Sequence, residues 1–312
     1  MALTNKLLIV EDVKRLFEKM NSEGTWCIKL IRIHSSNREG TNYDCREIGF
    51  SSKEVLIDHI EALKSKYLSG NKATIQKYNE LRLYDGTTDS QVIYWLNKTS
   101  DLINEAYAKL VESLANADQE GDPLKEKYSA YVLAGFVEDQ PIYLFSMQCP
   151  FVNMKRKHIW DNSIFRPIDK PILSLRLNAD VIMYDEKVYF LSMAGENLFN
   201  MERSYKATCS YCVNDIVESG IITNIECFQN TATSGSNPRR FVSFNNSYLE
   251  RLKHKKTRER IAKKFDIPVK DSFFDSEQEG ASEKIVKLLC GKGMVDPFDD
   301  IPMEVSGSKN WS

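Results

Sequence analysis

Two acidic residues and a lysine lie within one short stretch of the chain and are the best candidates for metal-dependent chemistry. Asp180 precedes the strand-like segment 181–184, and Asp185 and Lys187 follow it. Nucleases that use metal ions need carboxylates to hold the cations and a basic group close by to orient the attacking water. Turns between strands also favour Asp and Lys, however, and residues 185–187 are typical of a turn. We therefore expect no catalytic residue here, and a metal-dependent nuclease is the alternative.

A Cys-x-x-Cys pair, Cys209 and Cys212, is the best candidate for a structural metal site. A structural zinc ion needs four ligands, and the sequence has no second pair at a suitable spacing. Cys227 and His254 could complete such a site, but nothing in their spacing requires it. Because both thiols of the pair fit the apolar stripe of a helix, we interpret them as buried residues and expect neither a metal nor another cofactor.

Sequence motifs for nucleotide binding and for hydrolysis are absent. The chain has no G-x-G-x-x-G or Walker loop and no G-x-S-x-G elbow. The 4 histidines are spread along the chain and suggest no nucleophile–base pair. The sequence therefore favours a protein that acts by binding and not by catalysis.

The strongest local signal is a cluster of positive charge between residues 251 and 264. The cluster contains Arg251, Lys253, Lys255, Lys256, Arg258, Arg260, Lys263 and Lys264. Glu259 is the only acidic residue in that span, and the stretch 253–260 has no apolar side chain. A helix without an apolar stripe cannot bury that part of itself. We therefore expect these side chains to face water or a polyanion such as a nucleic acid, with a merely solvated helix face as the alternative.

Two further basic stretches lie upstream of this cluster. Arg239 and Arg240 end the segment 231–240, whose small polar residues are typical of an exposed loop, and we expect them to add phosphate contacts. Lys155–His158 and Trp160 form a smaller cluster on a predicted strand. Lysines commonly protect the edge of a sheet, and this interpretation is the favoured one for the smaller cluster.

The overall composition is that of a globular protein. Of the 312 residues, 42% are hydrophobic and 28% are charged, and the net charge of −2 gives no general attraction to DNA or lipid. The odd number of cysteines, 7, favours reduced thiols in the cytoplasm. The aliphatic run 7–10 is too short for a membrane span or a signal peptide, so we expect a cytoplasmic protein.

Hydrophobic spacing predicts the elements that position these candidates. In the first part of the chain we expect a helix around residues 13–20, strands at 26–33, 43–50 and 74–84, a helix ending near 68, and a long helix over 92–114. The polar stretch 115–124 suggests a boundary between an N-terminal domain, 1–118, and a C-terminal domain, 119–312.

The second part of the chain begins with strands and continues with helices. We expect a hairpin of strands 130–137 and 142–147, further strands at 172–177, 181–184 and 188–191, and helices at 198–219, 247–265 and 285–289. Residues 221–228 could be strand or loop, and the acidic segment 271–283 is expected to be mobile. The predicted class is α+β, with an N-terminal mixed α/β domain followed by an antiparallel sheet with helices.

Several of these segments together resemble a known family. They are the strand pair 131–136 and 142–145, the segments 175–180 and 188–190, and the helical entry Asn197-Leu198-Phe199-Asn200-Met201-Glu202. The pattern resembles the KwaB-like family of the bacterial Kiwa anti-phage system, from about residue 124 to the C-terminus. The resemblance implies an effector that binds DNA and blocks phage replication or late transcription. It also implies a membrane partner, KwaA, that senses infection and holds the effector at the inner membrane.

With this resemblance, DNA becomes the expected polyanion. A non-enzymatic scaffold whose basic helix binds an acidic protein or anionic lipid is the alternative, beside the nuclease. We expect it to be bound through Arg239, Arg240 and the helix 253–264, mainly at phosphates and with weak sequence specificity. A homo-oligomer, either a dimer or a tetramer, is expected because repeated basic patches raise avidity on a long polyanion. A further hypothesis is that the acidic segment 271–283 folds back on the basic helix and competes with DNA.

Overall fold

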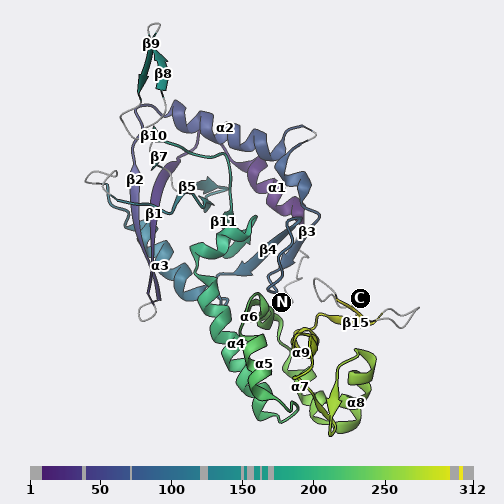
Figure 1. Cartoon of the computed structure of the whole chain (residues 1–312). Coiled ribbons are helices and arrows are strands. Elements are labelled where there is room, and N and C mark those ends of the chain that lie inside the picture. The colour runs from purple at the N-terminus through teal and green to yellow at the C-terminus, as the bar shows by residue number, and fades with distance from the viewer. Residues whose placement is uncertain are drawn as a thin grey trace. The chain divides into compact units, whose positions relative to one another are not determined.

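The computed structural model describes residues 9–36, 40–70, 72–119, 126–148, 151–152, 158–161, 164–167, 172–295 and 302–304. The chain forms two compact units, each containing more than one segment of sequence. The first unit comprises residues 1–83 and 90–200, and the second comprises 84–89 and 201–312. Helices and strands together confirm the predicted α+β class (Figure 1).

The first unit is built on a mixed sheet whose described strands follow the order β2-β1-β5-β6-β11-β12-β4-β3. These strands are β1 (Cys27–Ser36), β2 (Gly40–Ile48), β3 (Glu80–Leu83), β4 (Val92–Asn97), β5 (Ala130–Val137), β6 (Gln140–Ser146), β11 (Val181–Tyr184) and β12 (Lys187–Phe190). Neighbouring strands are antiparallel except for β3 and β4, which are parallel. The division that the sequence favours at residue 118 falls inside this unit, because β5 pairs with β1 and β12 pairs with β4.

Helices cover both faces of this sheet. The helices α1 (Val10–Lys19) and α2 (Glu54–Leu68) lie side by side, with the rings of Phe17 and Tyr67 stacked 4.1 Å apart (Figure 1). They pack against Ile28 and Leu30 of β1. The helix α3 (Asn104–Ala115) packs against β2, where its Ser113 hydroxyl donates a hydrogen bond to the Tyr43 carbonyl oxygen. Tyr43 lies opposite Ile33 of β1, so α3 covers the other face of the sheet.

The predicted helix 92–114 and the predicted strand 74–84 are each wrong in their N-terminal part. Val92–Asn97 is the inner strand β4 and not the start of a helix, because its side chains are buried on both faces and show no alternation. The segment 74–84 begins as the 3-10 helix η1 (Thr74–Lys77) and becomes extended only at β3. The remaining short elements of this unit are β7 (Phe151–Val152), β8 (His158–Asp161), β9 (Ile164–Pro167), β10 (Ile172–Leu173) and η3 (Met193–Leu198).

The second unit is mainly helical. Its elements are α4 (Met201–Glu218), α5 (Ile225–Ala232), α6 (Asn237–Arg240), η4 (Phe241–Ser243), α7 (Asn246–Lys253), α8 (Lys255–Lys264), β13 (Val269–Lys270), β14 (Phe273–Phe274), α9 (Ala281–Leu289), β15 (Gly293–Val295) and β16 (Pro302–Glu304). Its core joins apolar residues from most of these elements, including Ile216, Phe228, Leu252 and Ile285. The sequence suggested strand or loop for residues 221–228, but the chain from Ile225 onward forms the helix α5. Asn224 caps this helix, and its side chain accepts a hydrogen bond from the Cys227 amide.

The acidic segment 271–283 is packed against this core, contrary to the expectation of mobility. Phe274 is fully buried, and the Ser276 hydroxyl donates a hydrogen bond to the Asn224 carbonyl oxygen. The Asp275 carboxylate is also buried and accepts a hydrogen bond from the Glu277 amide. Among all the helices that the structure describes, none is both long and apolar enough to cross a membrane.

Candidate nucleic-acid interface

The basic cluster lies on two helices where the sequence predicted one. The helix α7 ends at Lys253, His254 adopts an extended conformation with φ −76° and ψ 119°, and α8 begins at Lys255. The side chain of Asn245 caps α7 by accepting a hydrogen bond from the Ser247 amide. The break turns the chain between Lys253 and Lys255, so the cluster covers two adjacent helices that contact each other.

Arg258 is buried, and the expectation that it faces water or a phosphate is wrong. Its guanidinium donates hydrogen bonds to the carbonyl oxygens of Leu252 (2.8 Å), Lys253 (3.2 Å) and Ser272 (2.6 Å). The carbonyls of the last turn of a helix lack partners within that helix, so Arg258 satisfies two of them at the end of α7. The guanidinium also lies 5.0 Å from the centre of the Phe273 ring. Arg258 therefore joins α7, α8 and the β13–β14 turn and is not available to DNA.

The other members of the cluster are exposed. Those on α8 are Lys255, Lys256, Arg260, Lys263 and Lys264, and those on α7 are Arg251 and Lys253. Because side chains four and seven positions apart share one face of a helix, Lys256, Arg260 and Lys263 form a stripe on α8. We call the seven exposed side chains the basic surface.

Few of these charges are neutralised by neighbours. Lys253 pairs with Glu250 at 2.6 Å, and Lys255 lies 3.9 Å from Glu259. Within the part of the chain that the structure describes, Arg251, Lys256, Arg260 and Lys263 lie within ion-pair distance of no carboxylate. Four adjacent cations without counter-ions produce a local positive potential that the net charge of the chain conceals.

Arg239 and Arg240 lie on α6 and not on the predicted exposed loop. Arg240 is half-buried, pairs with Glu283 at 3.4 Å and donates a hydrogen bond to the Asn237 side chain. Arg239 lies over the Tyr205 ring, 5.5 Å from its centre. The neighbouring Arg240 and Lys287 lower the pKa of Glu283, with Lys287 contributing more. These contacts hold both arginines within the helical unit, so they are weaker candidates for phosphate contacts than the basic surface.

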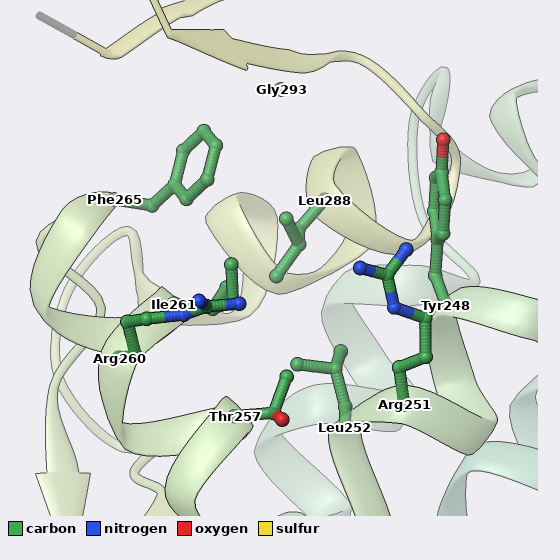
Figure 2. A pocket seen from close by; sticks show the side chains of 9 residues that line it. All are labelled: Tyr248, Arg251, Leu252, Thr257, Arg260, Ile261, Phe265, Leu288 and Gly293. Carbon is green, nitrogen blue, oxygen red and sulfur yellow. The ribbon is translucent and has the colours of Figure 1, made fainter. Parts of the chain in front are cut away.

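A small cavity of about 190 Å³ lies beside the basic surface (Figure 2). It is lined by Tyr248, Arg251, Leu252, Thr257, Arg260, Ile261, Phe265, Leu288 and Gly293. Leu252, Ile261 and Leu288 give it an apolar interior. The guanidinium groups of Arg251 and Arg260 extend toward the space between them (Figure 2). The sequence did not predict this cavity, although Ile261 and Phe265, four positions apart, indicated an apolar side at the end of α8.

Cys209 and Cys212 are buried on α4, as expected from their position in the apolar stripe. The Cys209 thiol donates a hydrogen bond to the Ala232 carbonyl oxygen at 3.5 Å. Burial raises the pKa of Cys209 to about 12 and that of Cys212 to about 11. Cys290 at the end of α9 is also buried and its pKa is raised to about 12. Among the described residues, no group of three or more His, Cys, Asp or Glu side chains is arranged to hold a metal ion.

The acidic residues considered for nuclease chemistry lie apart. Asp180 and Asp185 stand at the two ends of the four-residue strand β11, which separates them by about 16 Å at about 3.3 Å per residue. The Asp180 carboxylate accepts hydrogen bonds from the Met147 amide, the Asn178 side chain and the Ser192 hydroxyl. Asp185 belongs to the turn between β11 and β12, and Lys187 pairs with it at 3.4 Å.

The smaller basic cluster, Lys155–His158 with Trp160, lies largely outside the described residues. The structure describes the backbone of β8 from His158 onward, where it pairs with β9, and it describes neither Lys155–Lys157 nor the side chains of this hairpin. The expectation of a lysine-protected edge strand stays a prediction.

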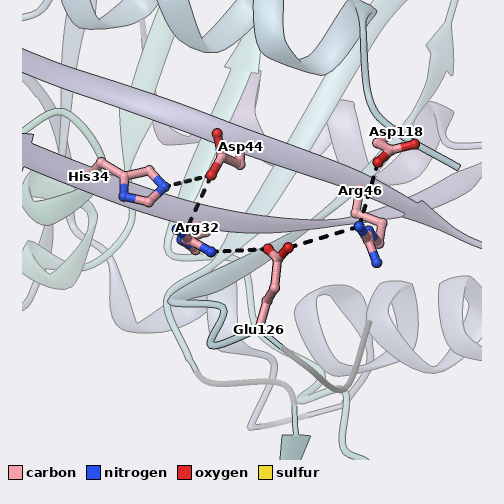
Figure 3. A network of polar contacts seen from close by, with 6 residues as sticks. All are labelled: Arg32, His34, Asp44, Arg46, Asp118 and Glu126. Atoms are coloured by element: carbon pink, nitrogen blue, oxygen red, sulfur yellow. Dashed lines mark hydrogen bonds and ion pairs between the residues drawn. The ribbon is translucent and has the colours of Figure 1, made fainter. Parts of the chain in front are cut away.

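A second polar network, which the sequence did not predict, joins β1 and β2 of the first unit to residues between α3 and β5 (Figure 3). It consists of Arg32, His34, Asp44, Arg46, Asp118 and Glu126. Glu126 lies 3.2 Å from Arg32 and 4.0 Å from Arg46. The Glu47 amide donates a hydrogen bond to the Asp118 carbonyl oxygen, so residue 118 covers part of the outer edge of β2. Because these opposite charges pair with one another, we interpret the network as protection of the sheet edge.

The fold and the site define an α+β protein whose helical unit displays an exposed basic surface. A family model described as "Kiwa protein KwaB-like" matches residues 125–290, which is more than half of the chain. The chain therefore belongs to the KwaB-like family, and this membership indicates a role in Kiwa anti-phage defence together with partner proteins of that system. Neither the comparison with curated proteins nor the comparison with solved structures gives a match.

Proposed function

We propose that this chain is a DNA-binding effector of Kiwa defence that uses the basic surface of α7 and α8. The observation that carries the proposal is the group of exposed cations, Arg251, Lys256, Arg260 and Lys263, which have no carboxylate partner among the described residues. A helix can be soluble without a group of neighbouring positive side chains that lack carboxylate partners, so solubility alone does not explain this group. A polyanion such as DNA would supply the missing negative charge and would release its own counterions on binding.

The kind of contact follows from the side chains that are available. Lysine and arginine side chains on an exposed helix face bind phosphate oxygens readily, and such contacts carry little sequence information. We therefore propose weak sequence preference, with DNA coverage as the means of blocking phage replication or transcription.

Two further parts of the proposal concern partners. Family membership supports a partner within the Kiwa system, and we propose the membrane protein KwaA, which would hold this chain at the inner membrane. We also propose a homo-oligomer, a dimer or a tetramer, because one chain offers a modest basic surface and several copies would increase the effective affinity for a long DNA.

We propose binding without cleavage. Metal-assisted cleavage requires carboxylates that converge on a cation, whereas the Asp180 carboxylate accepts three hydrogen bonds from its neighbours and is separated from Asp185 by the length of β11. Incubation of supercoiled DNA with the chain and Mg²⁺ or Mn²⁺ tests this. Nicking that disappears in an Asp180→Asn variant with unchanged stability would overturn the non-enzymatic proposal.

The hypothesis that the acidic segment 271–283 competes with DNA for the basic helix has less support than the sequence suggested. Glu283 pairs with Arg240 and Lys287, and Asp275 is buried, so neither carboxylate is placed on the basic surface. Deleting residues 271–283 would remove the fully buried Phe274 and unfold part of the core. Competition between the acidic segment and DNA is better tested with Glu277→Gln and Glu279→Gln, because these changes affect exposed side chains only. Unchanged DNA affinity in these variants would dismiss the hypothesis.

The binding test is fluorescence anisotropy with duplex DNA over a salt series. The native chain is expected to bind, with a slope of log affinity against log salt near −3.6 if about four phosphates are neutralised. A variant with Lys256→Glu, Arg260→Glu and Lys263→Glu should lose binding, because the changes place negative charge along the stripe.

The matched control carries Lys53→Glu, Lys72→Glu and Lys127→Glu, three exposed lysines of the first unit. It has the same net charge as the first variant, so it should bind DNA like the native chain if the local surface matters. Equal loss in both variants would indicate a nonspecific effect of net charge. Absence of binding by the native chain would contradict the proposal itself.

A further inference from the structure

We infer that the cavity between α7, α8 and α9 receives one pyrimidine base of a single-stranded DNA, with Arg251 and Arg260 bound to the adjacent phosphates. This inference rests on the proposed DNA binding and specifies the form of DNA. It starts from the juxtaposition of an apolar interior with two arginines that have no carboxylate partner in the described part of the chain.

The volume of the cavity agrees with one six-membered ring. A protein cavity of about 150 Å³ lined by Leu, Ile and Phe is known to hold benzene. The cavity here measures about 190 Å³ and is lined by the same kinds of side chain, Leu252, Ile261, Phe265 and Leu288. A single pyrimidine ring therefore fits, whereas the fused rings of a purine would project from the cavity.

The polar groups at the cavity match a nucleotide better than an apolar ligand. Arg251 and Arg260 extend from two different helices toward the space between them, and in the proposed complex they would bind the phosphates on either side of the inserted base (Figure 2). The Thr257 hydroxyl and the Tyr248 ring supply a hydrogen-bonding group and an aromatic surface. Cationic grooves that contain aromatic side chains are the usual means by which proteins bind single strands.

Duplex DNA cannot use this cavity without a penalty. Its bases are paired and stacked, and a base must leave the helix before it can enter a pocket. A duplex would still bind phosphates through Lys256, Arg260 and Lys263, but the cavity would stay empty. Single-stranded DNA with pyrimidine bases should therefore bind more tightly than a duplex of the same length.

The test uses fluorescence anisotropy with oligo(dT), oligo(dA) and a duplex, each about 16 nucleotides long. The native chain should bind oligo(dT) about tenfold more tightly than either of the other two. Thr257→Phe leaves every charge in place and fills the cavity. This change should weaken oligo(dT) binding about tenfold, as expected for the loss of one bound base, and should leave duplex binding unchanged.

Two further variants complete the design. Thr233→Phe introduces the same ring at the exposed position that follows α5, outside the cavity, and should bind all three DNAs like the native chain. Tyr248→Ala opens one wall of the cavity and should weaken oligo(dT) binding even if Thr257→Phe proves unstable in urea unfolding.

The outcomes separate this inference from the proposed function. Loss confined to oligo(dT) in Thr257→Phe or Tyr248→Ala supports the cavity as a base-binding site. Equal binding of the three DNAs by the native chain, unaffected by either variant, overturns the cavity inference and leaves the basic surface as the DNA site. Absence of binding to every DNA overturns both.

Discussion

Arg258 and Arg260 occupy opposite environments although they are two positions apart on α8. Two residues along an α-helix correspond to a rotation of about 200°, which places the two side chains on opposite faces. Arg258 points inward and donates to three backbone carbonyls, whereas Arg260 is exposed at the cavity. The same residue type therefore stabilises the fold at one position and is available to a ligand at the other.

We predict different effects of removing each guanidinium. Arg258→Met should lower the free energy of unfolding by about 2–4 kcal/mol, because the carbonyl oxygens of Leu252 and Ser272 lose a charged donor in a buried setting. Arg260→Met should lower it by less than about 0.5 kcal/mol, since its side chain is exposed. Urea unfolding at neutral pH measures both values.

The two variants are also controls for each other in DNA binding, because each removes one positive charge. Under conditions where both are folded, Arg260→Met should reduce the magnitude of the salt slope by about 0.9, and Arg258→Met should leave it unchanged. Equal stability of the two variants would contradict the structural role of Arg258.

At the scale of elements, α4 and α9 bring three buried thiols into the core of the second unit. Cys209 and Cys212 lie on α4, and Cys290 follows the last residue of α9. Burial is the largest cause of the raised pKa of each thiol, and each thiol therefore stays neutral in the folded chain well above neutral pH. Ionising any of these thiols in the folded chain is therefore unfavourable.

This arrangement predicts a loss of stability at alkaline pH. An unfolded cysteine ionises near pH 9, whereas folded Cys290 ionises near pH 12, so the unfolded chain binds fewer protons between these values and is favoured as pH rises. Between pH 7.5 and 10 the native chain should lose about 1 kcal/mol more stability than a Cys290→Ala variant. Urea unfolding at the two pH values measures the difference, and equal losses would contradict the prediction.

Elements with local signals could be predicted from the sequence. The hairpin of β5 and β6 shows apolar strands around Glu138 and Asp139, and the structure confirms it with a two-residue turn at which both residues have positive φ. The helix α4 was also expected, because its buried residues recur at helical spacing over five turns.

Elements whose environment depends on distant segments were not predictable. The strand β4 is covered on both faces, which removes the alternation that identifies a strand. The inward position of Arg258 depends on the end of α7 and on Ser272, and the sequence does not show that these segments meet. The exposure of the seven side chains of the basic surface, in contrast, could be predicted directly from their charge and spacing.

At the scale of the whole molecule, the residues 84–89 belong to the second unit although they lie between β3 and β4 of the first. Gly86 has φ +79°, and a Cβ at this position would lie 2.2 Å from the Arg239 carbonyl oxygen, so only glycine fits. The Ser243 hydroxyl donates to the Asp85 carbonyl oxygen, and the buried Lys292 ammonium pairs with the Asp85 carboxylate at 3.1 Å.

We predict that Asp85 and Lys292 are strongly coupled. Asp85→Asn should lower the free energy of unfolding by about 3 kcal/mol, because it leaves the Lys292 ammonium buried without its anion. Adding Lys292→Met should restore most of that loss, since no unpaired charge remains. Urea unfolding of the two single variants and the double variant gives the coupling energy, and additive effects would show that the pair is not coupled.

The Asp85–Lys292 ion pair can form only after both of its residues have been synthesised. The two residues are 207 positions apart, so a ribosome adding about 5–20 residues per second needs roughly 10 to 40 s to produce the second after the first. During that interval the segment 84–89 has left the ribosome without the unit to which it belongs. The second unit can therefore reach its final packing only after Lys292 has been synthesised.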